Sequence, residues 1–439
     1  MKLDPRSITL AMSANPAWVP VLQTMAETGA RAFGLDRNKG LRLAMGMEEI
    51  LVFLSRILPG ESIKITVGPD KSSVRAMFSL SAKSLDLSAM NVVAKLEGDE
   101  DDGHDLPLIL ASRISDSLDV NRIGQDIHLC LRQNHVYPTI SPNLSKPGPV
   151  RAPLRVEDSP DPTLIAEGCA RTLAAFPEGN LPPWFVRPGQ AADLVASGDL
   201  HVAMAMDATD IPCALLSWHT LSERCVTFSG PWVFASGGNG VPLLLEHMLS
   251  ILARSATVSL FNDPDATPPG LDFGKHGFEH LAFMPTPASM LGPSDPVPIW
   301  FRQLNEDNGL TVWSHPACVS FLEDIYGRLF LPRIIQAVVE TGRHKGDRSL
   351  FAAELKPEMS EVIIRPLLDG FDNGENIQRH LQVLAKEGYE RIFFSIDLAE
   401  GWQAALSGLL IEHGCQPLFV LPYGGRSDIL TFVYVQPAT

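Results

Sequence analysis

Apolar residues recur along this chain at two spacings, and each spacing predicts a different element. The stretch 41–54 places apolar residues on one face of a helix, namely Leu43, Met47, Ile50 and Leu54. Shorter apolar runs predict strands at 62–67, 74–80 and 126–132, and a further helix is expected at 106–118. Helices and strands therefore alternate through the first 136 residues, which predicts an α/β unit.

Two proline-rich stretches interrupt this pattern. Seven prolines fall within residues 137–162, where they remove backbone donors and resist regular structure. A second break lies at 286–297. We therefore predict three units of the α/β (α+β) class, at 1–136, 163–285 and 298–439, joined by linkers at 137–162 and 286–297.

The second and third units carry the same succession of segments. Each shows a glycine-bearing loop, an amphipathic helix, a buried strand, and then His-Gly opening an apolar strand that stops at proline. The loops are 237–240 and 370–374, the helices 241–253 and 377–386, and the closing strands begin at His276-Gly277 and His413-Gly414. One order of elements found twice favours a duplicated domain. The alternative is that two unrelated α/β units share the same order of glycine-bearing loops and terminal prolines.

The net charge of the chain, −16 at neutral pH, argues against nucleic acid as a partner, because phosphate backbones are bound by clustered Lys and Arg. The six cysteines form no C-x-x-C pair, which indicates free thiols in a reducing compartment. No stretch has the apolar length of a membrane span, and the first residues lack the apolar core of a signal peptide. We expect a cytoplasmic protein with no membrane partner.

The helix at 41–54 carries two adjacent acidic residues, Glu48 and Glu49, and an acidic loop at 97–103 follows the strands. This order resembles the ATPase fold of anti-sigma-factor serine kinases, within the larger histidine-kinase and gyrase (GHKL) class. The resemblance implies that Glu49 orients the nucleophile and that Gly103 remains from a lid that wraps phosphates. It also implies an Asn ligand for Mg²⁺ where this chain has Phe53, which cannot coordinate a metal. ATP binding is therefore expected to be weak or lost, and the alternative is a nucleotide-free scaffold.

A glycine-rich loop follows the apolar strand at 226–234 and precedes a helix. Backbone N–H groups at a helix start can take an anion, and the helix dipole favours it. The loop residues in that position are Gly237, Gly238, Asn239 and Gly240. This strand, loop and helix resemble those that hold acetyl-CoA in the GNAT acetyltransferases. The resemblance implies acetyl-CoA or another acyl-CoA as a ligand, with Ala235 in place of the family's Arg or Gln; the alternative is a plain glycine-rich turn.

Catalytic groups are less clearly marked in the second unit. GNAT members often carry a Tyr whose phenol protonates the leaving thiolate, and the corresponding positions here are Phe273 and, in the third unit, Leu410. On the central strands, Glu223 and His219 are the nearest candidates for a catalytic base. Either of them can equally be a surface residue near a strand turn.

The third unit has no phosphate loop of this kind, because Asp369 and Asp372 would repel a pyrophosphate. It closes in a predicted β-hairpin, in which Gly424 and Gly425 are expected to supply the positive φ. We interpret this unit as structural, or as the wall of an interdomain or dimer contact. Cysteine and histidine residues show no zinc-binding spacing, so no metal site is expected.

Two functions remain open from the sequence. The first is a regulatory protein whose ATPase-like unit docks a protein partner and whose GNAT-like units bind acyl-CoA, and the missing Asn and Tyr favour it. The second is an N-acyltransferase that uses acetyl-CoA in residues 163–285, which the retained Gly238 and Gly240 favour. A homodimer is compatible with both, and no motif names the acyl acceptor.

Overall fold

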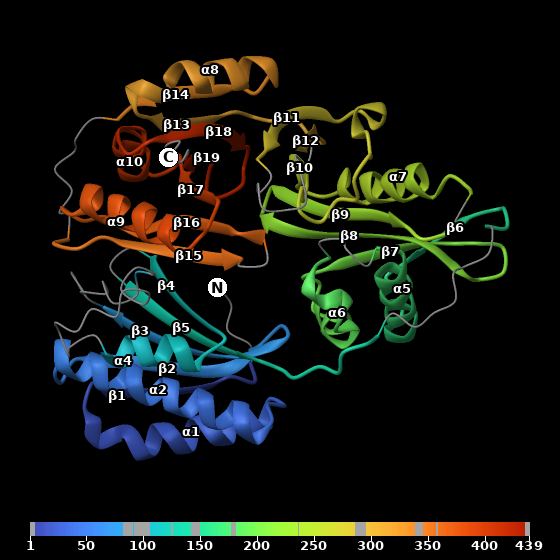
Figure 1. Ribbon diagram of the computed structural model, residues 1–439. Coiled ribbons are helices and arrows are strands. Elements are labelled where there is room, and N and C mark those ends of the chain that lie inside the picture. The colour runs from blue at the N-terminus through green and yellow to red at the C-terminus, as the bar shows by residue number, and fades with distance from the viewer. Residues whose placement is uncertain are drawn as a thin grey trace.

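The computed structural model describes residues 5–81, 91, 106–123, 126–141, 150–176, 181–235, 237–285, 296–338, 346–356 and 359–434 (Figure 1). Over the residues described, the fold is of the mixed α/β class, with sheets of five, seven, two and five strands. Within these ranges no helix is both long enough and apolar enough to cross a bilayer.

The first unit is a five-stranded antiparallel sheet with its helices on one face (Figure 1). Its elements are β1 (Ile8–Ser13), α1 (Val19–Ala32), α2 (Arg37–Ile57), β2 (Ser62–Asp70), β3 (Ser73–Ser81), α4 (Leu106–Ile114), β4 (Ser117–Ile123) and β5 (Asp126–Asn134), and the strand order is β1-β2-β3-β5-β4. The helix predicted at 106–118 is shorter than expected. It ends at Ile114, and the chain enters β4 at Ser117.

The second unit is built on the seven-stranded sheet, in the order β11-β12-β10-β9-β8-β7-β6. Its elements are β6 (Arg155–Asp158), α5 (Pro162–Ala175), α6 (Pro188–Ala196), β7 (His201–Met206), β8 (Pro212–Ser222), β9 (Cys225–Val233), α7 (Gly240–Leu252), β10 (Ser259–Asn262), β11 (Glu279–Met284) and β12 (Val297–Gln303). The sheet extends past both predicted boundaries of this unit. β6 lies inside the expected linker at 137–162 and pairs with β7, and β12 follows the expected linker at 286–297 and pairs with β10 and β11.

The third unit contains a two-stranded parallel sheet and a five-stranded sheet in the order β15-β16-β17-β19-β18. Its elements are β13 (Leu310–Ser314), α8 (Val319–Arg328), β14 (Arg333–Ala337), β15 (Leu350–Lys356), β16 (Glu361–Leu368), α9 (Asn373–Lys386), β17 (Arg391–Asp397), α10 (Gly401–Glu412), β18 (Cys415–Leu421) and β19 (Ile429–Tyr434). Strands β8 to β12 and β15 to β19 share one order and one set of parallel and antiparallel pairings. This shared topology supports the duplication that the repeated segments predicted.

The hairpin that closes the third unit forms as expected, but its turn chemistry was predicted wrongly. The positive φ of +59° belongs to Tyr423, and neither Gly424 nor Gly425 is among the residues with positive φ. Close packing explains the second glycine, because a Cβ at Gly425 would lie 2.6 Å from Asp397 Oδ2. The carboxylate of Asp397 also accepts the N–H of Arg426 at 2.8 Å, which fixes the turn to β17.

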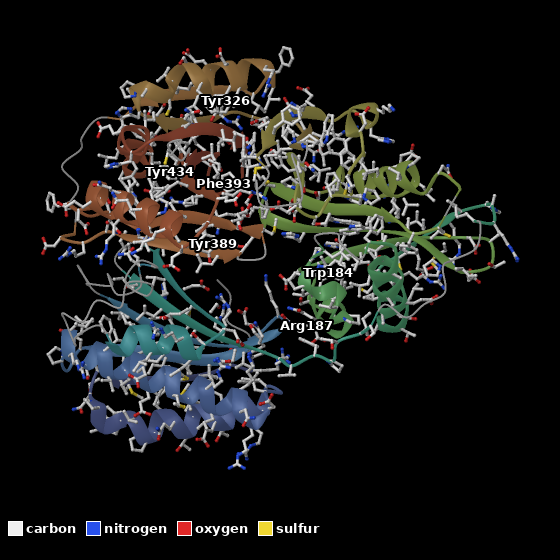
Figure 2. All side chains as sticks on the ribbon, viewed as in Figure 1. Trp184, Arg187, Tyr326, Tyr389, Phe393 and Tyr434 are labelled. Carbon is white, nitrogen blue, oxygen red and sulfur yellow. The ribbon has the colours of Figure 1, made fainter. Side chains whose placement is uncertain are left out.

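The three units pack against one another through buried apolar side chains. Phe261 and Phe301 of the second unit lie in the same buried cluster as Phe351 and Phe393 of the third. Figure 2 places Phe393 inside the third unit. Leu350, near the start of β15, belongs to the core of the first unit. The units therefore share apolar cores and are not joined by linkers alone.

Candidate functional site

The glycine loop of the second unit forms the end of β9 and the start of α7. The N–H groups of Phe234 and Ala235 both donate to the carbonyl of Cys213, which anchors the loop on β8. Gly237 and Gly238 then adopt φ values of +89° and +96°. L-residues rarely adopt this conformation, so both glycines are required by the backbone path. Whether the loop holds a pyrophosphate, as the sequence predicted, stays a prediction.

The N-terminus of α7 is open to a ligand. The Asn239 side chain makes no capping hydrogen bond, and the first turn contains no acidic residue. Gly237, Gly238 and Asn239 are exposed. Pro242 has no N–H, so the unpaired donors of the first turn come from its other residues. An anion at this helix end would meet backbone donors and the positive end of the helix dipole.

Arg151 lies beside this loop, and sequence analysis missed it. A Cβ at Gly238 would lie 3.3 Å from Val150 Cγ1, so the segment that carries Arg151 packs against the loop. The backbone N–H of Arg151 donates to Asp207 Oδ2 at 3.3 Å, and its side chain is exposed. An exposed guanidinium on this segment can offer a charged donor to an anion bound at the loop. No local pattern marks Arg151, because it lies in the proline-rich stretch, far from the loop in sequence.

The edge of β9 is closed by protein at Phe228 and Gly230. β10 pairs with β9 only as far as Asn262 and Phe228. Beyond that point, the N–H of Asp263 donates to the Phe228 carbonyl at 2.7 Å, and the N–H of Gly230 donates to the Ala266 carbonyl at 2.9 Å. The next residue, Pro231, has no N–H to offer. An extended ligand arm would therefore find the Phe228 carbonyl and the Gly230 N–H already paired within the protein.

The segment 263–266 is held from the third unit by an ionic cluster. Asp265 accepts a hydrogen bond from Arg391 at 3.1 Å and lies 3.9 Å from the ammonium of Lys356. Glu361, which is 1% exposed, pairs with Lys356 at 2.8 Å and with Arg391. The closure of the β9 edge therefore depends on residues of β15, β16 and β17.

Burial, and then the neighbouring Asp265, raises the pKa of Asp263 to about 6. The folded protein thus binds this proton more strongly than the unfolded chain, and the contribution of Asp263 to stability falls as the pH rises from about 4 to 6. We expect Asp263→Asn to gain up to about 3 kcal/mol relative to the parent across that window, since one pKa unit corresponds to about 1.4 kcal/mol. Urea unfolding at a series of pH values measures the difference.

The matched control is Asp272→Asn, because Asp272 also accepts a backbone N–H but is exposed. It measures the effect of the same side-chain change at an exposed position. A stability difference between Asp263→Asn and the parent that does not change between pH 4 and 6 would contradict the assignment.

The two candidate bases lie in different surroundings. His219 is half-buried in β8 opposite Thr227, next to the buried pair Ser217 and Ser229, and these side chains share one face of the sheet. Burial, and then Lys71 of the first unit, lowers the pKa of His219 and keeps its imidazole neutral. Glu223 is exposed in the turn between β8 and β9. The structure therefore places His219 in a polar row at the sheet centre and Glu223 at the surface.

The positions where a tyrosine could protonate a thiolate are core positions. Phe273 is 1% exposed and packs edge-on against Phe228, at 5.2 Å between ring centroids. Leu410 is fully buried in α10. Neither side chain carries a hydroxyl, so this chain has no proton donor at either position.

In the third unit, the loop before α9 attaches the first unit to the third. Asp372 Oδ1 accepts the N–H of Ser349 at 2.6 Å. Asn91 of the first unit donates to the Ser349 carbonyl at 3.1 Å. A Cβ at Gly370 would lie 2.2 Å from the Ser349 nitrogen. These contacts cover the N-terminus of α9, whereas the N-terminus of α7, the matching helix of the second unit, is exposed.

In the first unit, the residues of the ATPase-like motif do not form a metal site. Glu49 is half-buried in α2, and burial followed by the charge of Glu48 raises its pKa. Phe53 is 1% exposed and belongs to the core. Gly103, assigned to the lid, lies outside the described residues. Among the described residues, no group of three or more acidic, His or Cys side chains could hold a metal ion.

Comparison with protein-family models gave no match, and comparison with curated proteins gave none either. Among solved structures, this chain is similar to a Mycobacterium tuberculosis protein with RsbU and RsbW domains, at 8% identity and a TM-score of 0.22, over 30% of this chain and 33% of that one. It is also similar to a GNAT-family acetyltransferase from Bacillus cereus (14% identity, TM-score 0.27, 35% of this chain and 100% of that one). A further similar structure is a spermidine N-acetyltransferase from Vibrio cholerae, solved with CoA and spermine. It shares 13% identity at a TM-score of 0.27, over 34% of this chain and 95% of that one. Because these TM-scores are low, the fold and the site are described above from this chain's own strand order and contacts.

Proposed function

We propose that this is a regulatory, partner-binding protein whose second unit binds the pyrophosphate half of an acyl-CoA and does not transfer the acyl group. The observation that carries the proposal is the closed edge of β9, where Asp263 and Ala266 take the backbone groups of Phe228 and Gly230. The absence of a hydroxyl at Phe273 supports it as well.

Anion binding is supported by the loop that follows the C-terminal end of the same strand. There the loop at 237–240 is exposed, α7 has no side-chain cap, and Arg151 lies on the adjoining segment. A pyrophosphate carries the charge and the acceptor oxygens that such a helix end favours. The acyl end of the ligand would extend over the surface and contribute little to affinity.

The ligand series that tests this proposal is CoA, acetyl-CoA and ADP, titrated calorimetrically into the full chain. We expect CoA and acetyl-CoA to bind equally within a factor of about two, because the acyl group makes no contact of its own. Near 100 times its dissociation constant, a ligand adds about 2.7 kcal/mol to the stability of the folded protein, so a thermal shift gives a second readout. A thiol-release assay with amine acceptors should stay at background.

Gly238→Asp is expected to abolish binding of all three ligands, because it places a carboxylate in the loop. Its control is Gly198→Asp, since Gly198 also has a positive φ, +76°, with open space around it. The control keeps the backbone strain and the added charge but lies at the end of α6, and we expect it to bind like the parent. Binding that survives Gly238→Asp would place the ligand elsewhere.

N-acyl transfer is the second candidate, and the polar row around His219 favours it. A neutral imidazole beside Ser217, Thr227 and Ser229 is suited to accept a proton from an amine. This function predicts that acetyl-CoA binds more strongly than CoA. It also predicts that thiol is released in the presence of an amine acceptor and that His219→Ala abolishes this release. Either result would replace the regulatory proposal by the transferase.

A further inference from the structure

The outward face of the first unit is formed by α1 and α2. The opposite face of its sheet lies toward β15 and β16, and Leu350 and Leu368 of the third unit complete its core (Figure 1). Asn91 ties the same side to β15 through Phe351, whose N–H donates to Asn91 Oδ1 at 2.9 Å. A partner of this unit therefore finds the helices accessible and the sheet covered.

The two helices run antiparallel and present apolar side chains to solvent. A Cβ at Gly40 would lie 3.3 Å from Ala30, and Gln23 donates to Glu48 at 2.6 Å, which fixes the alignment of the pair. The exposed large apolar residues on this face are Trp18, Val21, Leu41 and Met45, at 44%, 44%, 52% and 45% exposure. On α2, Leu41 and Met45 are four residues apart and continue the row that begins at Arg37.

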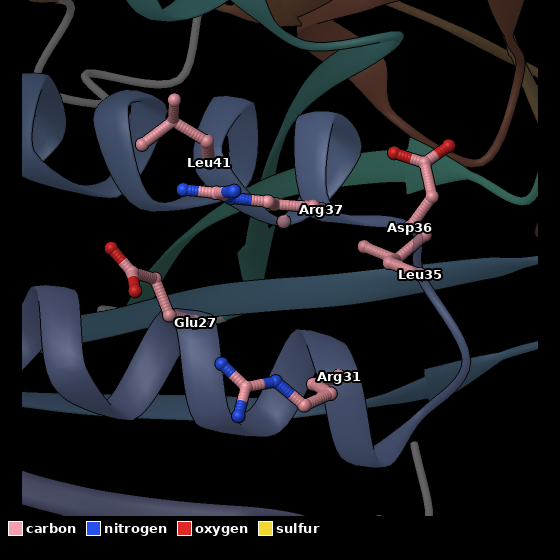
Figure 3. Close-up of a pocket in the computed structure, with 7 residues that line it drawn as sticks. Glu27, Arg31, Leu35, Asp36, Arg37 and Leu41 are labelled. Atoms are coloured by element: carbon pink, nitrogen blue, oxygen red, sulfur yellow. The ribbon is translucent and has the colours of Figure 1, made fainter.

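A pocket of about 550 Å³ lies at the end of this face, between the C-terminus of α1 and the N-terminus of α2. Figure 3 shows the side chains of Arg31 and Arg37 extending into the space between the helices, near Glu27. Neither guanidinium has an ion-pair partner among the described residues. Asp36 caps α2 by accepting the Lys39 N–H at 2.8 Å, and its carboxylate points away from Arg37.

We propose that the α1–α2 face, defined by Val21, Leu41, Met45, Arg31 and Arg37, docks an amphipathic helix of a protein partner that carries carboxylates at one end of its apolar stripe. The inference rests on the proposed function, because it names the kind of partner that the regulatory protein binds. Apolar residues of the partner cover the α1–α2 stripe, and its carboxylates bind the two guanidinium groups. The chain as a whole carries a charge of −16, and Glu27 and Asp36 line the pocket together with the two arginines. An acidic partner is therefore attracted by the two guanidinium groups themselves and not by a net positive charge of the pocket.

The test uses the full chain and a labelled 18-residue peptide with leucines at helical spacing and three glutamates at one end. A twin peptide has lysines in place of the glutamates. Fluorescence anisotropy should show saturable binding of the glutamate peptide that weakens with salt, and at least tenfold weaker binding of the lysine twin. We expect the double variant Arg31→Glu, Arg37→Glu to weaken binding of the glutamate peptide at least tenfold, and Leu41→Asp to weaken binding of both peptides.

The control carries the same charge change elsewhere, Arg187→Glu with Arg254→Glu, since both arginines are exposed on the second unit. It should bind the glutamate peptide like the parent. Equal binding of the two peptides, no saturable binding, or binding unaffected by reversal of Arg31 and Arg37 would each overturn the inference. The titration contains no CoA, so its failure leaves the acyl-CoA proposal standing, and failure of the CoA titrations leaves this one standing.

Discussion

Arg333→Met is expected to lower the free energy of unfolding by about 3–5 kcal/mol, because it leaves two buried carboxylates without their cation. The Arg333 side chain is fully buried, and its Nε and Nη1 atoms lie 2.7 Å from Asp428 Oδ2 and from Asp307 Oδ2. Tyr423 donates its hydroxyl to Asp307 in the same cluster. Methionine fills part of the space but leaves both carboxylates uncompensated.

Guanidinium chloride unfolding measures this loss, and Arg365→Met is the control. Arg365 pairs with Glu354 at 3.3 Å, but both side chains are at least half exposed, so the control should cost at most about 1 kcal/mol. Adding Asp307→Asn to Arg333→Met removes one of the unpaired charges and should recover part of the loss. A loss below about 1 kcal/mol for Arg333→Met would show that the cluster is solvated.

The same cluster has a defined pH dependence. Burial alone would raise the pKa of Asp307, but the hydrogen bonds from Tyr423 and Arg333 outweigh burial and lower it. A carboxyl with a lowered pKa contributes stability that is present above its unfolded pKa and is lost as the pH falls through its folded pKa. Acid should therefore weaken the contact that Asp307 makes with Arg333.

Arg391→Met should cost a similar 3–5 kcal/mol and, in addition, open the edge of β9. The Arg391 side chain is 6% exposed and holds both Asp265 and Glu361. Its loss leaves Glu361 with Lys356 alone and removes the 3.1 Å hydrogen bond to Asp265. Because Asp265 belongs to the segment that pairs with Gly230, the amide of Gly230 should lose protection.

Hydrogen exchange read by mass spectrometry separates the two effects. Peptides that cover 228–233 should exchange faster in Arg391→Met under conditions where the core strands remain protected. The control is Arg426→Met, whose side chain is 77% exposed in its pair with Glu400. Unchanged exchange at Gly230 with full loss of stability would show that the cluster supports the fold but does not hold the β9 edge.

Local signals in the sequence predicted the features that depend on local conformation. Gly237, Gly238, Gly277 and Gly414 were marked by their place after a strand or helix, and all four adopt positive φ. Prolines misled the placement of the unit boundaries, because they flank β6 and stand before and within the start of β12, at Pro298, without interrupting either strand. A proline-rich stretch can join two strands of one sheet as readily as two domains.

The parts of the site that sequence analysis missed depend on contacts distant in the chain. Arg151 reaches the loop through Val150, and the β9 edge is closed by a segment whose anchor, Arg391, belongs to another unit. Nothing near Gly230 in the sequence indicates that its N–H has a partner at Ala266. Only the folded arrangement shows that the strand before the exposed glycine loop is paired with the segment 263–266.

The core shared by Phe261, Phe301, Phe351 and Phe393 restricts how this protein can change during evolution. Modular proteins gain functions by exchange of domains between genes, which works where a boundary crosses few contacts. Here, a new second unit would arrive without the apolar side chains, such as Phe261 and Phe301, that pack in the core of the third unit. We therefore expect the second and third units to have diverged together, because a substitution in the shared core of one unit favours a compensating substitution in the other.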